Sequence, residues 1–146
     1  MFVQNQGTIN YQIQAQLSRA MSLQYSVNMH AKFDLEDRLV AFATDVILFT
    51  GSLPKNYAAE RLKEQLTRSS MSSALNYGEA QGAESRRDFK HKLSITLKEL
   101  KESRVGMKIL TRLEYGNTTS RTTLHRECEE LIAIFATIIK RTSLDN

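Results

Sequence analysis

The chain has 146 residues, 41% hydrophobic and 25% charged, which is ordinary for one globular domain with a single core. One proline and six glycines leave few chain breaks, which favours long helices over a many-turned β fold. The single cysteine, Cys128, excludes an internal disulfide framework and suits a reducing compartment, so we expect a cytoplasmic location. The longest apolar run, residues 131–136, is too short to span a bilayer, so we expect no membrane partner.

Residues 1–30 differ in composition from the rest of the chain. They contain no acidic residue, one arginine (Arg19) and six glutamines. Apolar and polar residues alternate over positions 9–17, which is typical of a strand, but no partner strand is evident later in the sequence. We therefore predict that residues 1–30 are an appendage outside the core and that residues 31–146 form the folded domain.

Two helices are predicted in the first half of that domain. Asp34 is a suitable N-cap for a helix over residues 34–50, which Gly51 would end. A second helix is expected over residues 56–81, with a middle, residues 68–73, that is poor in helix-forming residues. The small side chains in this middle either allow another helix to approach closely or mark a kink.

Two further helices are predicted in the second half. Ser85 is a suitable N-cap for a helix over residues 85–115, and a polar loop over residues 116–120 separates it from a last helix over residues 123–142. Four helices with short connections predict an all-α protein, an antiparallel up-down-up-down four-helix bundle.

Basic residues crowd one face of the third predicted helix. Residues 86–112 contain nine lysines and arginines against three acidic residues, an excess of six positive charges. On a helical wheel all of the nine except Lys92 fall within roughly 120°. Such a ridge suits a phosphate backbone, because each neutralised phosphate releases counterions. We predict that it binds nucleic acid, RNA or DNA, with structured RNA as the first choice, through Arg86, Arg87, Lys90, Lys101, Arg104 and Lys108.

The alternative for this ridge is an ordinary solvated helix face whose bases pair with acids on a neighbouring helix. The bundle would then be a scaffold that recruits a protein partner without nucleic acid. No aromatic residue lies among the lysines and arginines of the ridge, so stacking on the nucleobases of a single strand is not indicated.

The apolar surface of the last predicted helix is wider than the single stripe that a helix at the edge of a bundle buries. Eight of the nine residues 131–139 are apolar, and Thr137 is the exception. Either this helix is central in the bundle or its second face meets another subunit. We favour a homo-oligomer with an interface formed by Leu131, Ile134, Phe135 and Ile138.

No residue pattern indicates an active site. The sequence shows neither a glycine-rich phosphate loop nor a nucleophile elbow, so we predict no catalytic residue and no enzyme activity. His125, Cys128 and Glu129 have the spacing of metal ligands on a helix, but a structural zinc needs four ligands and no second cluster exists. We therefore expect neither a metal nor another cofactor.

From residue 33 onward the chain resembles the 23S rRNA intervening-sequence protein family, bacterial four-helix-bundle proteins first noted as products of intervening sequences in large-subunit ribosomal RNA genes. The resemblance covers about residues 33–142, and the first 30 residues have no counterpart in it. Its motifs follow in the expected order and spacing at residues 33–40 (FDLEDRLV), 65–69 (QLTRS), 72–80 (SSALNYGEA), 84–89 (ESRRDF), 97–100 (LKEL) and 127–132 (ECEELI).

The resemblance implies a helical bundle without enzymatic activity that assembles into a ring-like homo-oligomer, a homopentamer. Similar proteins include the accessory subunits of diversity-generating retroelement reverse transcriptases, basic barrels that contact nucleic acid and the polymerase. A reverse transcriptase or another protein is therefore an expected partner, although the general role of the family is unsettled.

Overall fold

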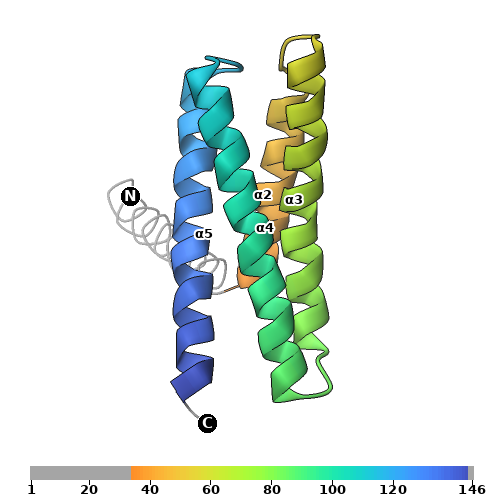
Figure 1. Cartoon of the computed structure of the whole chain (residues 1–146), viewed down its shortest axis with the longest axis vertical. Coiled ribbons are helices and arrows are strands. Elements are labelled where there is room, and N and C mark those ends of the chain that lie inside the picture. Colours follow the sequence, from red (N-terminus) through yellow and green to blue (C-terminus); the bar gives the residue numbers. More distant parts are fainter. Residues whose placement is uncertain (1–33, 145–146) are drawn as a thin grey trace, which may run out of the picture. The chain divides into compact units, whose positions relative to one another are not determined.

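Four α-helices make up the part of the chain that the structure, a computed structural model, describes, residues 34–144. They are α2 (Leu35–Thr50), α3 (Tyr57–Gln81), α4 (Arg86–Arg112) and α5 (Thr118–Leu144), and no strand occurs in this range. Consecutive helices run in opposite directions and are joined by short turns (Figure 1). The all-α bundle predicted from the sequence is confirmed.

Side-chain caps define the starts of the helices. Asn56 accepts a hydrogen bond from the backbone N–H of Ala59 at 2.9 Å, and Ser85 accepts one from Asp88 at 3.1 Å. Each cap satisfies an N–H that has no partner within the helix. The predicted starts at residues 56 and 85 therefore lie at the caps themselves.

The predicted start of the last helix, residue 123, is wrong. Helix α5 begins at Thr118, because the Asn117 side chain accepts hydrogen bonds from the Ser120 backbone N–H at 3.0 Å and from its hydroxyl at 3.2 Å. The preceding helix ends at Arg112 rather than at residue 115. Gly116 follows with a φ of +76°, and a side chain there would meet the Phe49 ring at 2.6 Å, so glycine is required at this turn.

Small side chains bring α3 and α4 close together. Helix α3 continues without interruption through residues 68–73, and Ser69, Ser70 and Ser73 are buried. The hydroxyls of Ser69 and Ser103 lie 2.7 Å apart in a hydrogen bond between the two helices. Close approach, rather than a kink, is thus the role of these serines.

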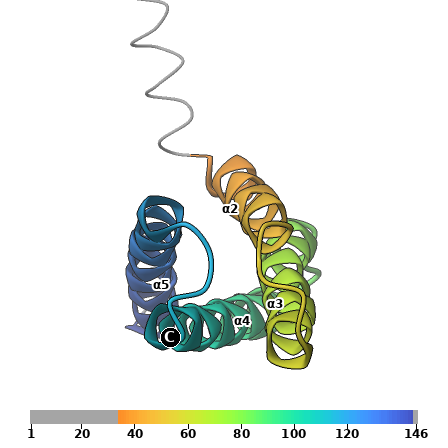
Figure 2. The ribbon, with the colours of Figure 1, turned by 90° about the horizontal axis from the view of Figure 1, so that it is seen from above.

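Helix α2 lies across the bundle from α4, which lies between α3 and α5 (Figure 2). It packs through large apolar side chains, of which Leu39, Phe42 and Val46 are almost fully buried. Its one base, Arg38, reaches α5 and donates to Glu127 at 2.6 and 2.9 Å and to Glu130 at 2.6 Å. Hydrogen bonds from these carboxylates raise the pKa of the Arg38 guanidinium, so the positive end of this bridge between the two helices keeps its charge.

The apolar run of α5 is largely explained by the core of the single chain. Leu131 and Phe135 are 0% exposed, and the Phe135 ring contacts Tyr77 edge-on at a centroid distance of 5.3 Å. Both side chains are covered within one chain, so they offer no surface to a second copy. Ile134 and Ile138 are half-buried and stay a prediction for a subunit contact.

The predicted appendage, residues 1–30, lies outside the described residues, so the prediction that it is separate from the core stays open. None of the helices in the range 34–144 combines the length and the apolarity that crossing a bilayer would demand.

Candidate nucleic-acid interface

Helix α4 divides lengthwise into a buried side and an outward side. The buried side carries small and apolar residues such as Leu93, Ser103 and Met107. Eight of the nine lysines and arginines of α4 occupy the outward side; six of the eight are exposed, and Lys90 and Arg104 are partly covered. The ninth, Lys92, lies outside this side on the wheel and is partly covered. The exposed ones are Arg86, Arg87, Lys98, Lys101, Lys108 and Arg112.

Acids neutralise only part of this basic face. Arg104 pairs with Glu129 of α5 at 3.6 Å, Lys98 pairs with Glu102 at 3.7 Å, and Lys92 pairs with Glu79 of α3. Four of the six predicted nucleic-acid residues form no ion pair within the described part of the chain: Arg87, Lys90, Lys101 and Lys108. Arg86 is exposed in the first turn, and the Nε of Arg104 is buried with no hydrogen-bond partner among the described residues.

Two acids of α4, Glu99 and Glu102, contact α3, and Glu102 also pairs with Lys98. Glu102 accepts from Arg68 at 2.5 Å and from Gln65 at 3.0 Å. The side chain of Glu99 is only 8% exposed and lies 3.4 Å from Arg68. Buried carboxylates require such a partner. Few acidic side chains therefore neutralise the lysines and arginines of the outward side.

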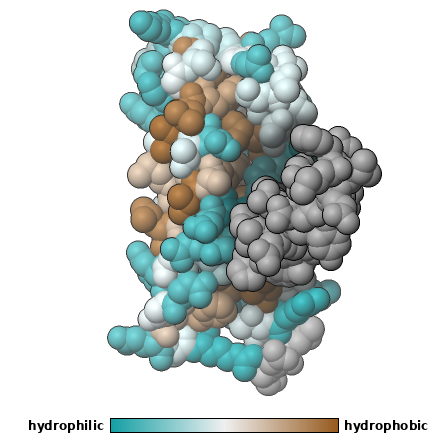
Figure 3. Space-filling model, turned by 180° about the vertical axis from the view of Figure 1, so that it is seen from behind, coloured by the Kyte–Doolittle hydropathy of each residue, from teal (hydrophilic) through white to brown (hydrophobic). Residues whose placement is uncertain are grey.

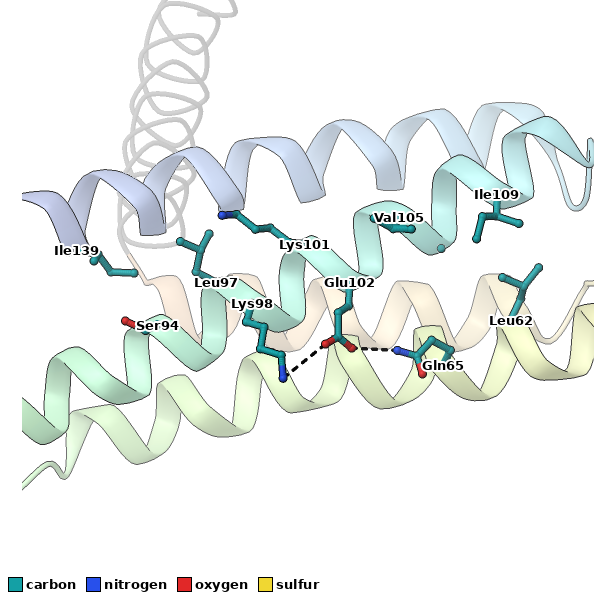
Figure 4. A pocket seen from close by; sticks show the side chains of 11 residues that line it. Leu62, Gln65, Ser94, Leu97, Lys98, Lys101, Glu102, Val105, Ile109 and Ile139 are labelled. Carbon is teal, nitrogen blue, oxygen red and sulfur yellow. Dashed lines mark hydrogen bonds and ion pairs between the residues drawn. The ribbon is translucent and has the colours of Figure 1, made fainter.

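Apolar side chains form a groove within the same outward side, a feature that the sequence prediction missed. Its volume is about 610 Å³, and Figure 4 shows Lys98 and Lys101 among its lining residues. Val105 is 53% exposed and Ile109 is 42% exposed. Exposed apolar side chains do not contribute to phosphate binding, so these residues are not explained by a phosphate-binding surface alone. The apolar lining residues are Leu62, Leu97, Val105, Ile109 and Ile139.

Cys128 is a core residue. Its side chain is 0% exposed and donates a hydrogen bond to the Leu100 carbonyl at 3.3 Å. Burial raises the pKa of this thiol to about 12, which keeps it neutral, whereas a metal ligand must be a thiolate. Within residues 34–144 no three His, Cys, Asp or Glu side chains are grouped so that they could hold a metal ion.

The fold and the charged outward face define a class of protein, small antiparallel helical bundles with a basic surface on one helix. The chain belongs to the 23S rRNA-intervening sequence protein family, whose model matches residues 32–137.

Among solved structures, the chain is similar to a protein of unknown function from the S23 ribosomal protein family of Bacteroides thetaiotaomicron. The two share 30% sequence identity with a TM-score of 0.66, over 72% of this chain and 97% of the other. A search of curated proteins finds no match.

Proposed function

We propose that the protein is a non-catalytic, cytoplasmic homo-oligomer that binds structured RNA through the outward basic face of α4. The observation that supports this most is the absence of ion-pair partners, within residues 34–144, for Arg87, Lys90, Lys101 and Lys108. Basic side chains without an ion-pair partner, arranged along one helix, can contact successive phosphates of a nucleic-acid backbone. Such contacts gain affinity from the release of counterions and do not recognise the nucleobase sequence.

RNA is the preferred ligand for two reasons. The family is described by its connection to 23S ribosomal RNA. In addition, duplex RNA is recognised mainly through its shape and its backbone, which a basic helix without aromatic side chains can contact. From the resemblance to the family we propose five subunits. A ring of five would present five copies of the basic face, so that weak contacts between each copy and the RNA add up to a higher overall affinity.

The groove supports a second candidate function, a scaffold that recruits a protein. Val105 and Ile109 are apolar and exposed in the middle of the basic face, which favours a protein partner at that position. Relation to the accessory proteins of diversity-generating retroelements would make a reverse transcriptase one such partner.

A salt titration of RNA binding tests the proposed function. The affinity of the full chain for a fluorescent duplex RNA is measured by anisotropy between about 50 and 300 mM salt, with duplex DNA and a single strand alongside. Three or four phosphate contacts per chain should give a slope of about −3 in a plot of log K against log salt, because each contact contributes about 0.9 on a duplex. If no nucleic acid binds near physiological salt, RNA binding is wrong and the scaffold function stands.

A further inference from the structure

Apolar and basic side chains alternate along the middle of α4. Val105 is 53% exposed and Ile109 is 42% exposed, and both line the groove. Lys101 lies about one helical turn before Val105 and Lys108 about one turn after it, at exposed positions roughly 10 Å apart along the helix axis. Neither lysine forms an ion pair within residues 34–144. A group that enters the groove beside Val105 therefore has a positive charge on each side of it.

The groove has the size of a site for a small ligand. Its volume is about 610 Å³, within the range of roughly 300–1,000 Å³ that is usual for pockets that bury small molecules. Leu62 of α3 lies on the other side of the groove from Ile109 (Figure 4), so a flat group would have aliphatic side chains on both of its faces. Enzymes that extrude a nucleobase from a duplex hold it between aromatic or apolar side chains in this way.

The acid that lines the groove does not oppose a phosphate. Glu102 accepts hydrogen bonds from Arg68 at 2.5 Å and from Gln65 at 3.0 Å, and it pairs with Lys98 at 3.7 Å. Its negative charge is therefore neutralised by its neighbours, which leaves the charge of Lys101 to a ligand.

Exposed apolar side chains on the opposite side of the molecule lack such flanking charges. Figure 3 views the molecule from the side of α2 and shows apolar side chains gathered in a band. On α2, Val40 is 50% exposed and Ile47 is 42% exposed. The one basic residue of this helix, Arg38, is bound to Glu127 and Glu130. Helix α2 therefore offers no unpaired basic residue to a phosphate.

We propose that the groove on α4 receives an unpaired nucleobase that bulges from duplex RNA, while Lys101 and Lys108 bind the phosphates on its two sides. This rests on the proposed RNA binding and names the kind of structured RNA, a duplex interrupted by a bulge. A bulged nucleobase has already lost its pairing partner, so moving it out of the stack costs less free energy than extruding a paired one.

The two features of the outward side then serve one ligand. The lysines contact the backbone, and the aliphatic walls of the groove contact the flat face that every nucleobase has. The groove therefore selects for the bulge and not for the sequence of the RNA.

Three matched RNA duplexes test this proposal. One is fully paired, one carries a single bulged adenosine, and one carries an abasic nucleotide at the bulge, which keeps the phosphates and the interrupted backbone but lacks the nucleobase. Fluorescence anisotropy gives the affinity of the full chain for each duplex at one salt concentration. The duplex with the bulged adenosine should bind about tenfold more tightly than the paired duplex, in the lower part of the range for stacking of one nucleobase because the walls are aliphatic. The abasic bulge should bind like the paired duplex.

Val105→Ser combined with Ile109→Ser removes one wall of the groove and should abolish the preference for the bulged adenosine. The affinity for the paired duplex and its salt dependence should not change. Both positions are exposed, and serine has about the helix propensity of valine and isoleucine, so circular dichroism should show an intact helical fold. Val40→Ser combined with Ile47→Ser is the matched control, since it makes the same two changes at similarly exposed positions of α2 and should keep the tenfold preference.

Equal binding of the bulged and the paired duplex, or of the adenosine bulge and the abasic bulge, would overturn insertion of the nucleobase and leave the proposed RNA binding standing. A preference that survives Val105→Ser with Ile109→Ser would also overturn it, and the groove would then be free for a protein partner. Absence of binding to all three duplexes would overturn the proposed function as well.

Discussion

Replacing Arg87, Lys90 and Lys108 together by glutamate should abolish binding of duplex RNA near physiological salt. These three basic residues form no ion pair within the described range and do not line the groove, so their replacement removes phosphate contacts and leaves the groove unchanged. At low salt, where residual binding is measurable, the slope of log K against log salt should shrink by about three. The loss should be equal for every RNA sequence, since phosphate contacts carry no sequence information.

A matched triple variant separates this local effect from net charge. Lys55, Arg126 and Lys140 are exposed bases outside α4, and their replacement by glutamate changes the net charge by the same amount. This control should retain most of the affinity. If both triple variants lose binding alike, the affinity comes from the overall charge of the protein and not from α4.

Ser103→Leu should lower the free energy of unfolding by about 3 kcal/mol. Ser103 is 0% exposed, and its hydroxyl lies 2.7 Å from that of Ser69 where α3 and α4 are closest. A larger side chain forces the helices apart at about 1–3 kcal/mol, and loss of the hydrogen-bond partner of a buried hydroxyl adds a similar cost. The melting temperature should fall by roughly 10–20 °C, measured by circular dichroism at fixed protein concentration.

Thr137→Leu is the control for this substitution. Thr137 is an exposed helical hydroxyl residue of α5 that bonds only to the Ala133 carbonyl of its own helix, at 2.8 Å. Its replacement should shift the melting temperature by a few degrees at most. Equal stability of the two variants would mean that α3 and α4 are not tightly packed at Ser103.

Much of the fold was predictable because local signals and burial agree. Asn56 and Ser85 cap helices where the sequence placed helix starts, and Leu39, Phe42 and Val46 are core residues with helical spacing. The start of α5 was missed because residues 118–120 are Thr, Thr and Ser, which disfavour helix interiors, whereas the Asn117 cap permits them in a first turn.

The candidate site was only partly predictable. The wheel placed the bases of α4 on one side, and they do lie outward, since periodicity determines which residues share a face. It could not show that Glu99 is buried beside Arg68, that Leu131 and Phe135 are covered within the chain, or that Val105 and Ile109 line a groove. These depend on which helix lies next to which, and the apolar spacing within a single helix does not contain that information.

Lysine footprinting with and without duplex RNA tests the central claim most directly. The full chain is treated briefly with an acetylating reagent, and mass spectrometry gives the extent of modification at each lysine. Lys90 and Lys108 should be protected by RNA, whereas Lys55 and Lys140, which lie outside α4, should be modified as fast as in its absence. Equal modification of Lys90 and Lys108 in both samples, or protection confined to Lys55 and Lys140, would contradict RNA binding by the outward face of α4.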